Sequence, residues 1–174
     1  MARGTDDGAA RFEGADIPQP TFAEDTGDAA PLVARALADY ALDAGALPEA
    51  LVALQSSRLL VPVVAVLGEG GPGEHGSEQE KDSEMATVLM QGADGRLALL
   101  AFTGMDALAR WDRSARPVPV AASDAASAAV TEGAAAMVVD IAGPVPVTVE
   151  GDDLHGFARG WTLARLGDRT AWVQ

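Results

Sequence analysis

EMATVLMQGADGRLALLAFTGMDALARW, residues 84–111, contains the clearest pattern of secondary structure in the chain. Two apolar runs flank a turn sequence in which Asp94-Gly95 supplies the residue types that tight hairpins favour. Thr103 follows the second run, and an acid stands three residues later at Asp106, a pattern typical of a capping box at the start of a helix. The stretch therefore predicts a β-hairpin that runs directly into a helix.

Upstream, the sequence predicts two helices and a buried strand. Apolar residues recur at helical spacing after Pro31, and a second helix opens at residues 47–49, LPE. Residues 59–67, LLVPVVAVL, are a continuous apolar run rich in β-branched residues, which indicates a buried strand. Pro62 inside this run predicts an edge position or a bulge, because proline cannot donate a backbone hydrogen bond.

Downstream, short strands and helices alternate. The predicted elements are a strand at 118–120, a helix at 124–132 capped by Ser123, strands at 136–141 and 144–149, a helix opening at 152–153, and a hairpin of 161–166 with 169–173. Strands that first pair locally and then alternate with helices predict an α/β (α+β) class. We expect a mixed, mostly antiparallel sheet with helices packed on it, in a single domain.

The net charge of −14 is unevenly distributed along the chain. Residues 1–30 hold seven acids and two arginines, and residues 67–84 hold six acids and one lysine. Both segments have too little apolar surface to offset an ordering entropy of about 1–2 kcal/mol per residue. The sequence predicts a disordered acidic tail at 1–29, a folded domain at 30–174 and a mobile acidic loop at 67–83. Deletion of the tail should leave the melting temperature nearly unchanged.

Composition also bears on location and partners. The chain has no cysteine, which removes disulfides and thiolate chemistry and suits a reducing cytoplasm. The polar N-terminus is not typical of a secretory signal, and the longest apolar run, at 59–67, is well short of the about 20 residues that span a membrane. Acidic charge disfavours nucleic acid and anionic lipid surfaces. We expect a bacterial cytoplasmic protein with no nucleic-acid or membrane partner.

Four segments carry a family resemblance by their order and spacing. They are RALADYALDAGALPEALVALQSSRLLVPVVA (35–65), KDSEMATVLMQGADGRLALLAFTGMDALARW (81–111), RPVPV (116–120) and VVDIAGPVPVTVEGDDLHGFARG (138–160). Together they resemble the N-terminal domain of the SseB family. The resemblance implies an α/β domain of bacterial cytoplasmic proteins, and it supplies no catalytic residues.

Signatures of enzymatic chemistry are missing from the sequence. There is no G-x-S-x-G, no phosphate-binding G-x-x-x-x-G-K-[ST] and no dinucleotide fingerprint. His75 lies in the acidic loop and His155 near a predicted helix start, and neither has the spacing of a metal site, so we predict no metal or cofactor. Asp140 ends an apolar strand, where burial would raise its pKa, but a turn-forming role explains it more simply.

The basic density of the predicted domain gathers around a tryptophan. We group its arginines and neighbouring aromatics as a candidate interaction patch: Arg96, Phe102, Arg110, Trp111, Arg113 and Arg116. Arginine and tryptophan are enriched at protein interfaces, and arginine binds carboxylates well. A structural role is the alternative for Arg110, which stands four residues after Asp106 at a salt-bridge spacing worth about 0.2–0.5 kcal/mol.

Two kinds of function remain open from the sequence. The missing catalytic motifs favour a non-enzymatic protein-interaction or regulatory module, with a protein partner or a second copy of the chain. The alternative is a small-ligand sensor or an enzyme of unrecognised type. An enclosed pocket with two or more convergent polar side chains would favour that alternative.

Overall fold

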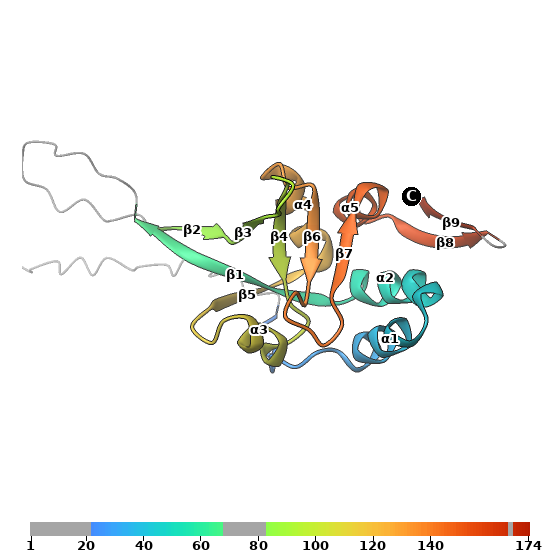
Figure 1. The fold of residues 1–174 in the computed structure, drawn as a ribbon, viewed down its shortest axis with the longest axis horizontal. Coiled ribbons are helices and arrows are strands. Elements are labelled where there is room, and N and C mark those ends of the chain that lie inside the picture. Colours follow the sequence, from blue (N-terminus) through green and yellow to red (C-terminus); the bar gives the residue numbers. More distant parts are fainter. Residues whose placement is uncertain (1–21, 68–82, 167–168) are drawn as a thin grey trace, which may run out of the picture.

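The computed structural model describes residues 22–67, 83–166 and 169–174. These residues form five α-helices, one short 3-10 helix and nine strands (Figure 1). In chain order the elements are α1 (Pro31–Leu42), η1 (Ala44–Ala46), α2 (Leu47–Gln55), β1 (Arg58–Leu67), β2 (Ser83–Thr87), β3 (Leu89–Gln91), β4 (Leu97–Ala101), α3 (Met105–Trp111), β5 (Arg116–Ala121), α4 (Ala122–Thr131), β6 (Ala136–Val139), β7 (Val147–Glu150), α5 (Gly151–Ala158), β8 (Thr162–Leu166) and β9 (Arg169–Val173).

The described strands form two main sheets and a hairpin. One sheet has the order β2-β1-β5 with antiparallel pairs, and the other has the order β3-β4-β6-β7. In the second sheet β4 and β6 are parallel and the other pairs are antiparallel, while β8 and β9 pair with each other. The predicted α+β class with mostly antiparallel strands is therefore confirmed, with the strands divided between sheets.

Two connections join the main sheets. β2 and β3 are one run of chain interrupted at Val88, so the strand predicted at 84–91 pairs first with β1 and then with β4. In addition, Leu60 of β1 and Phe102 exchange two backbone hydrogen bonds of 2.8 and 2.9 Å. The predicted hairpin is confirmed between β3 and β4, whereas β2 leaves it to join the other sheet.

Pro62 lies in the central strand of its sheet, so the predicted edge position is wrong. The N–H and C=O groups of Leu60 point toward Phe102 and away from β5. These groups point to alternate sides from one residue to the next along a strand, so residues two apart share a direction. Pro62 therefore faces away from β5 as well, and it lies opposite Pro117. Its missing N–H costs no bond between β1 and β5, and its carbonyl accepts a hydrogen bond from the Val88 N–H.

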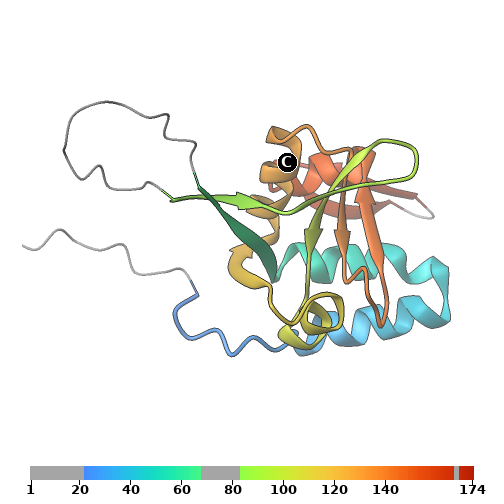
Figure 2. The same cartoon turned by 60° about the vertical axis from the view of Figure 1, so that its left-hand side comes forward.

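The main core lies between one face of the strands and four helices, α1, α2, α4 and α5. In Figures 1 and 2, α1 and α2 run side by side along one end of the strands. Alanines on α4 are fully buried, which lets this helix pack closely against α5 and the strands. A second cluster, formed by Leu60, Leu100, Phe102, Ala107 and Leu108, lies where α3 covers the other face.

Both predicted N-caps are wrong. α3 begins at Met105 with Gly104 as its N-cap, and the hydroxyl of Thr103 bonds elsewhere. α4 begins at Ala122, so Ser123 lies inside its first turn and makes no capping hydrogen bond. Spacing alone cannot identify a cap when a tertiary partner competes for the hydroxyl.

The acidic tail and loop fall largely outside the described residues, which exclude 1–21 and 68–82, and there they stay predictions. Residues 22–29 are described, and we call them the strap. The strap lies against the start of α3, where the Met105 N–H donates to Gly27 O at 2.8 Å. A Cβ at Gly104 would lie 2.8 Å from the backbone nitrogen of Ala29, so only glycine allows this approach.

The predicted C-terminal hairpin of β8 and β9 is confirmed, and Trp172 attaches it to α5. The Trp172 ring meets Phe157 edge-on at 5.7 Å, and its Nε1 donates to Asp153 Oδ1 at 2.8 Å. Gly156 leaves room for this ring, because a Cβ there would overlap it. Since a lone two-stranded hairpin is marginally stable, this contact sets its position.

Candidate functional site

The structure does not bring the predicted interaction patch together on one surface. Arg96 precedes the first residue of β4 and Phe102 follows its last, which separates them by about 20 Å of extended chain. Arg96 instead pairs with Asp94 at 2.6 Å and Glu150 at 3.3 Å. Phe102 is fully buried in the second core cluster.

The remaining patch residues lie near α3. Trp111 packs on Phe102 with ring centroids 5.5 Å apart and is only partly exposed. Arg110 reaches Asp106 at 3.9 Å in the predicted spacing, and both side chains are largely exposed. Arg113 and Arg116 are exposed. An interaction role for Arg110, Trp111, Arg113 and Arg116 stays a prediction.

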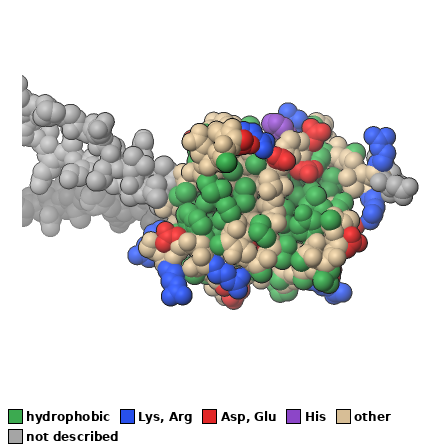
Figure 3. Space-filling model, viewed as in Figure 1, with side chains coloured by type: hydrophobic (Ala, Val, Ile, Leu, Met, Phe, Trp, Pro, Cys, Tyr) green, Lys and Arg blue, Asp and Glu red, His purple; other side chains and the backbone are tan. Residues whose placement is uncertain are grey.

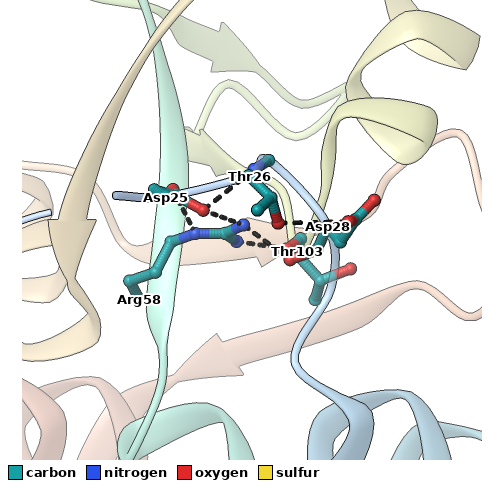
Figure 4. Close-up of polar contacts among 6 residues, drawn as sticks. Asp25, Thr26, Asp28, Arg58 and Thr103 are labelled. Carbon is teal, nitrogen blue, oxygen red and sulfur yellow. Dashed lines mark hydrogen bonds and ion pairs between the residues drawn. The ribbon is translucent and has the colours of Figure 1, made fainter. Parts of the chain in front are cut away.

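Arg58, at the start of β1, is the centre of a polar network that the strap completes (Figure 4). Its Nε and Nη2 donate to the two carboxylate oxygens of Asp25 at 2.6 and 2.8 Å. Nη2 also donates to the Asp28 carbonyl and Nη1 to the Thr103 carbonyl. The hydrogen bond from Arg58 holds the pKa of Asp25 below its usual value, and the Gly27 N–H adds to this effect.

Thr103 links this network to Asp140, the residue after β6. Its N–H and hydroxyl donate to the two carboxylate oxygens of Asp140 at 2.8 and 2.7 Å. Asp140 is 1% exposed and has a φ of 53°, the left-handed region that non-glycine residues rarely adopt. Burial raises the pKa of Asp140, and the two bonds from Thr103 oppose this rise. The backbone of Asp140 opens a turn, since the Gly143 N–H donates to its carbonyl at 2.8 Å, but its side chain does not form that turn. The other possibility that the sequence offered, a buried acid with a raised pKa, is the one the structure shows.

A groove of about 670 Å³ lies between α1, α2 and the hairpin. Its walls are mainly apolar and include Leu32, Val33, Ala36, Val52, Ala53 and Leu163. Two of these side chains are unusually exposed for their type, Leu32 at 78% and Val52 at 43%. Exposed apolar side chains gathered in a concave surface are typical of a binding site.

Charged residues at the groove include two arginines and one acid, in a chain that is acidic overall. Arg165 of β8 pairs with Glu49 of α2 at 2.8 Å, and both side chains are more than half exposed. Arg58 lines the groove as well, so the groove meets the polar network that holds the strap.

A second hollow, of about 450 Å³, lies between α1 and α3. Thr103, Asp106 and Asp140 line it, and the facing side of α1 is apolar, including Ala38 and Leu42. This hollow has the convergent polar side chains expected of a small-ligand site. Both oxygens of Asp140 are already bonded to Thr103, which leaves Asp106 as the more accessible acid.

A shallower apolar hollow of about 430 Å³ lies over β4 and β6. In Figure 3 hydrophobic side chains occupy much of the centre of the face in view, and charged side chains lie mostly around its margin. Met90, Ala98 and Val138 line the hollow and are partly exposed. It lies on the opposite face of the strands from the main core.

The described residues contain neither a group suited to a metal ion nor a helix suited to a membrane. Across 22–67, 83–166 and 169–174, no three histidine, aspartate or glutamate side chains are grouped so as to hold a metal ion. His155 is exposed on α5, and His75 lies outside the described residues. None of the described helices has the length and apolar character needed to cross a membrane.

Sequence reasoning missed the groove and the strap. Leu32 and Val33 are adjacent apolar residues at the start of α1 and lie about 100° apart around the helix, so they can face two different apolar surfaces. Arg58 at the head of an apolar strand was a signal of a charged partner, because a buried arginine needs one. The identity of that partner, Asp25, lies 33 residues away in the chain and had no local signal.

The fold and these surfaces define a small α+β domain with an apolar groove on its helical side. The family model described as SseB protein N-terminal domain matches residues 33–156. The chain therefore belongs to the SseB family, as the resemblance implied. No curated protein and no solved structure gives a match to the chain. The match ends before the hairpin, so one wall of the groove comes from residues beyond the matched region.

Proposed function

We propose that the chain is a non-enzymatic protein-interaction module that binds an apolar segment of a protein partner in the groove between α1, α2 and β8. The observation that carries the proposal is the exposure of Leu32 and Val52 in a concave, mainly apolar surface. Burial of both side chains by a partner would remove apolar surface from water, which favours association by about 25 cal/mol per Å². The lack of cysteine supports a cytoplasmic setting for this interaction.

The test compares proteins retained by three immobilised forms of the full chain. Wild type and Val130→Asp should retain the same partner, whereas Leu32→Asp/Val52→Asp should lose it. Val130 is a matched control because it is 38% exposed, apolar and on α4, away from the groove. Thermal melts would verify that all three forms fold. Equal retention by all three would contradict the groove as the binding surface.

A small-ligand sensor is the second candidate, and the hollow lined by Thr103, Asp106 and Asp140 favours it. A ligand with a hydrogen-bond donor would meet Asp106 there, and its apolar part would contact α1. Saturation-transfer NMR with a fragment collection would test this function. Fragments that bind wild type should fail to bind Ala38→Trp, in which a large side chain fills the hollow. Binding that is unchanged in Ala38→Trp would exclude this hollow as the ligand site.

A further inference from the structure

One wall of the groove is a strand with an unpaired edge. Among the described residues β8 pairs only with β9, and both Leu163 and Arg165 of β8 line the groove. The backbone groups of these two residues form no hydrogen bond with any other described element. A strand edge that borders an apolar groove is the arrangement by which several domains bind extended peptides.

The direction of the backbone groups in β8 follows from its pairing with β9. Leu166 lies opposite Arg169 across a two-residue connection, and the pair beside such a connection is hydrogen-bonded. Hydrogen-bonded and non-hydrogen-bonded pairs alternate along an antiparallel ladder, so Leu163 and Arg165 belong to non-bonded pairs. Their N–H and C=O groups therefore point away from β9. Trp161 follows the same alternation, and its carbonyl accepts a hydrogen bond from Gln55 of α2. The free edge of β8 therefore faces α2 and the groove.

The charges around this edge favour an acidic ligand. Arg58 is already bound by Asp25, so Arg165 is the accessible cation among the residues that line the groove, and Glu49 is its partner. Arg165 is 64% exposed at its side chain, so a carboxylate can reach it without displacing the core. Because an exposed ion pair is weak, a ligand carboxylate can replace Glu49 on Arg165, which favours an acidic residue in the segment beside this edge.

We propose that the partner enters the groove as an extended acidic segment that adds a strand to the free edge of β8. This proposal rests on the proposed function of the groove and specifies the form of the partner. The backbone of the segment would bond to Leu163 and Arg165, and every second side chain would contact the apolar side of α1 and α2. Acidic residues of the segment would meet Arg165.

The experiment uses a displayed library of ten-residue peptides, selected on the full chain and counter-selected on Leu32→Asp/Val52→Asp. We expect the selected peptides to alternate apolar and polar residues and to carry glutamate or aspartate. N-methylation of one alternate set of their backbone nitrogens should abolish binding, and methylation of the other set should not. In hydrogen exchange, bound peptide should slow the Leu163 and Arg165 amides roughly tenfold or more.

A charge variant adds an independent measurement. Arg165→Glu should weaken the selected peptides by about two- to fivefold, the range of an exposed ion pair. Arg113→Glu is the matched control, since Arg113 is also exposed but lies after α3, and it should leave the affinity unchanged. Equal weakening by both variants would contradict a specific role for the β8 edge.

Other occupants give different results. Selected peptides that bind as helices, with no amide protection in β8, would overturn strand addition and leave the groove function intact. A chain that dimerises by light scattering, and that Leu32→Asp/Val52→Asp makes monomeric, would assign the groove to a second copy and overturn the proposal. A library that yields no groove-dependent peptide would count against both strand addition and the proposed function.

Discussion

The guanidinium of Arg58 donates two hydrogen bonds to the carboxylate of Asp25, at 2.6 and 2.8 Å, and both side chains are less than 15% exposed. This bidentate pair joins the first residue of β1 to the strap. The same guanidinium bonds to the Thr103 carbonyl, and Thr103 in turn bonds to Asp140. Removal of one member leaves buried polar groups without partners, which is what makes the network testable.

Truncation distinguishes the strap from the residues before it. Deletion of 1–21 should leave the melting temperature nearly unchanged, whereas deletion of 1–29 removes Asp25 and the Asp28 carbonyl and leaves Arg58 with the Thr103 carbonyl. Loss of hydrogen bonds to a charged group costs about 1.5–3 kcal/mol, which lowers the melting temperature of a domain of this size by roughly 3–12 °C. The contacts of the strap thus change the expectation for the longer deletion. Calorimetry that finds equal melting temperatures for the two deletions would contradict the role of the strap.

The pair also predicts a loss of stability in acid. The pKa of Asp25 is lowered in the folded protein, so its stabilising effect is present above the unfolded value of 3.8 and is lost as the pH falls through the folded pKa. Asp25→Asn should be less stable than wild type at pH 7, and this difference should shrink below about pH 4. Urea unfolding at several pH values measures the difference. A difference that stays constant from pH 7 to pH 3 would show that the charge of Asp25 is unimportant.

Asp140 predicts the opposite dependence on pH. Burial raises its pKa, so the folded protein holds the proton more tightly and stability falls as the pH rises from the unfolded value through the folded pKa. Asp140→Asn keeps the geometry for bonding to Thr103 and tolerates the φ of 53°, so it should be more stable than wild type at pH 7 and about equal to it in acid.

Asp140→Ala is the control for the hydrogen bonds, because it removes both acceptors and leaves the N–H and the hydroxyl of Thr103 without a partner. It should cost about 1–3 kcal/mol at neutral pH. Denaturant unfolding of the three proteins from pH 3 to pH 8 provides the measurement. If Asp140→Asn is as damaging as Asp140→Ala at pH 7, the negative charge stabilises the fold and our prediction is wrong.

The attachment of the hairpin can be tested at Gly156 and Trp172. Gly156→Ala places a methyl group against the Trp172 ring and should cost about 1–3 kcal/mol, as overpacking does. The same change in a Trp172→Ala background should cost little, because the ring is no longer there. A double-mutant cycle from denaturant unfolding measures this coupling. Equal costs in both backgrounds would mean that the ring does not occupy this position.

The β3–β4 hairpin and the buried strands could be predicted from local sequence patterns. The turn at Asp94-Gly95 and the apolar alternation beside it predicted β3 and β4, and the order of helices and strands predicted the α+β class. The family resemblance had the same origin. These features depend on neighbours within a few residues, so they can be predicted before the chain folds.

Contacts between residues that are distant in the chain could not be predicted from local patterns. Thr103 looked like a helix cap, but its hydroxyl bonds to Asp140, 37 residues away. Phe102 and Arg96 looked like neighbours in one patch, but β4 separates a buried ring from an exposed, paired arginine. The groove needs α1, α2 and β8 together, whereas local sequence patterns predict only the separate elements. The hydrophobic effect that packs these elements together is non-directional, so an apolar face does not specify which other apolar face it will contact. Their arrangement therefore depends on the packing of the whole domain.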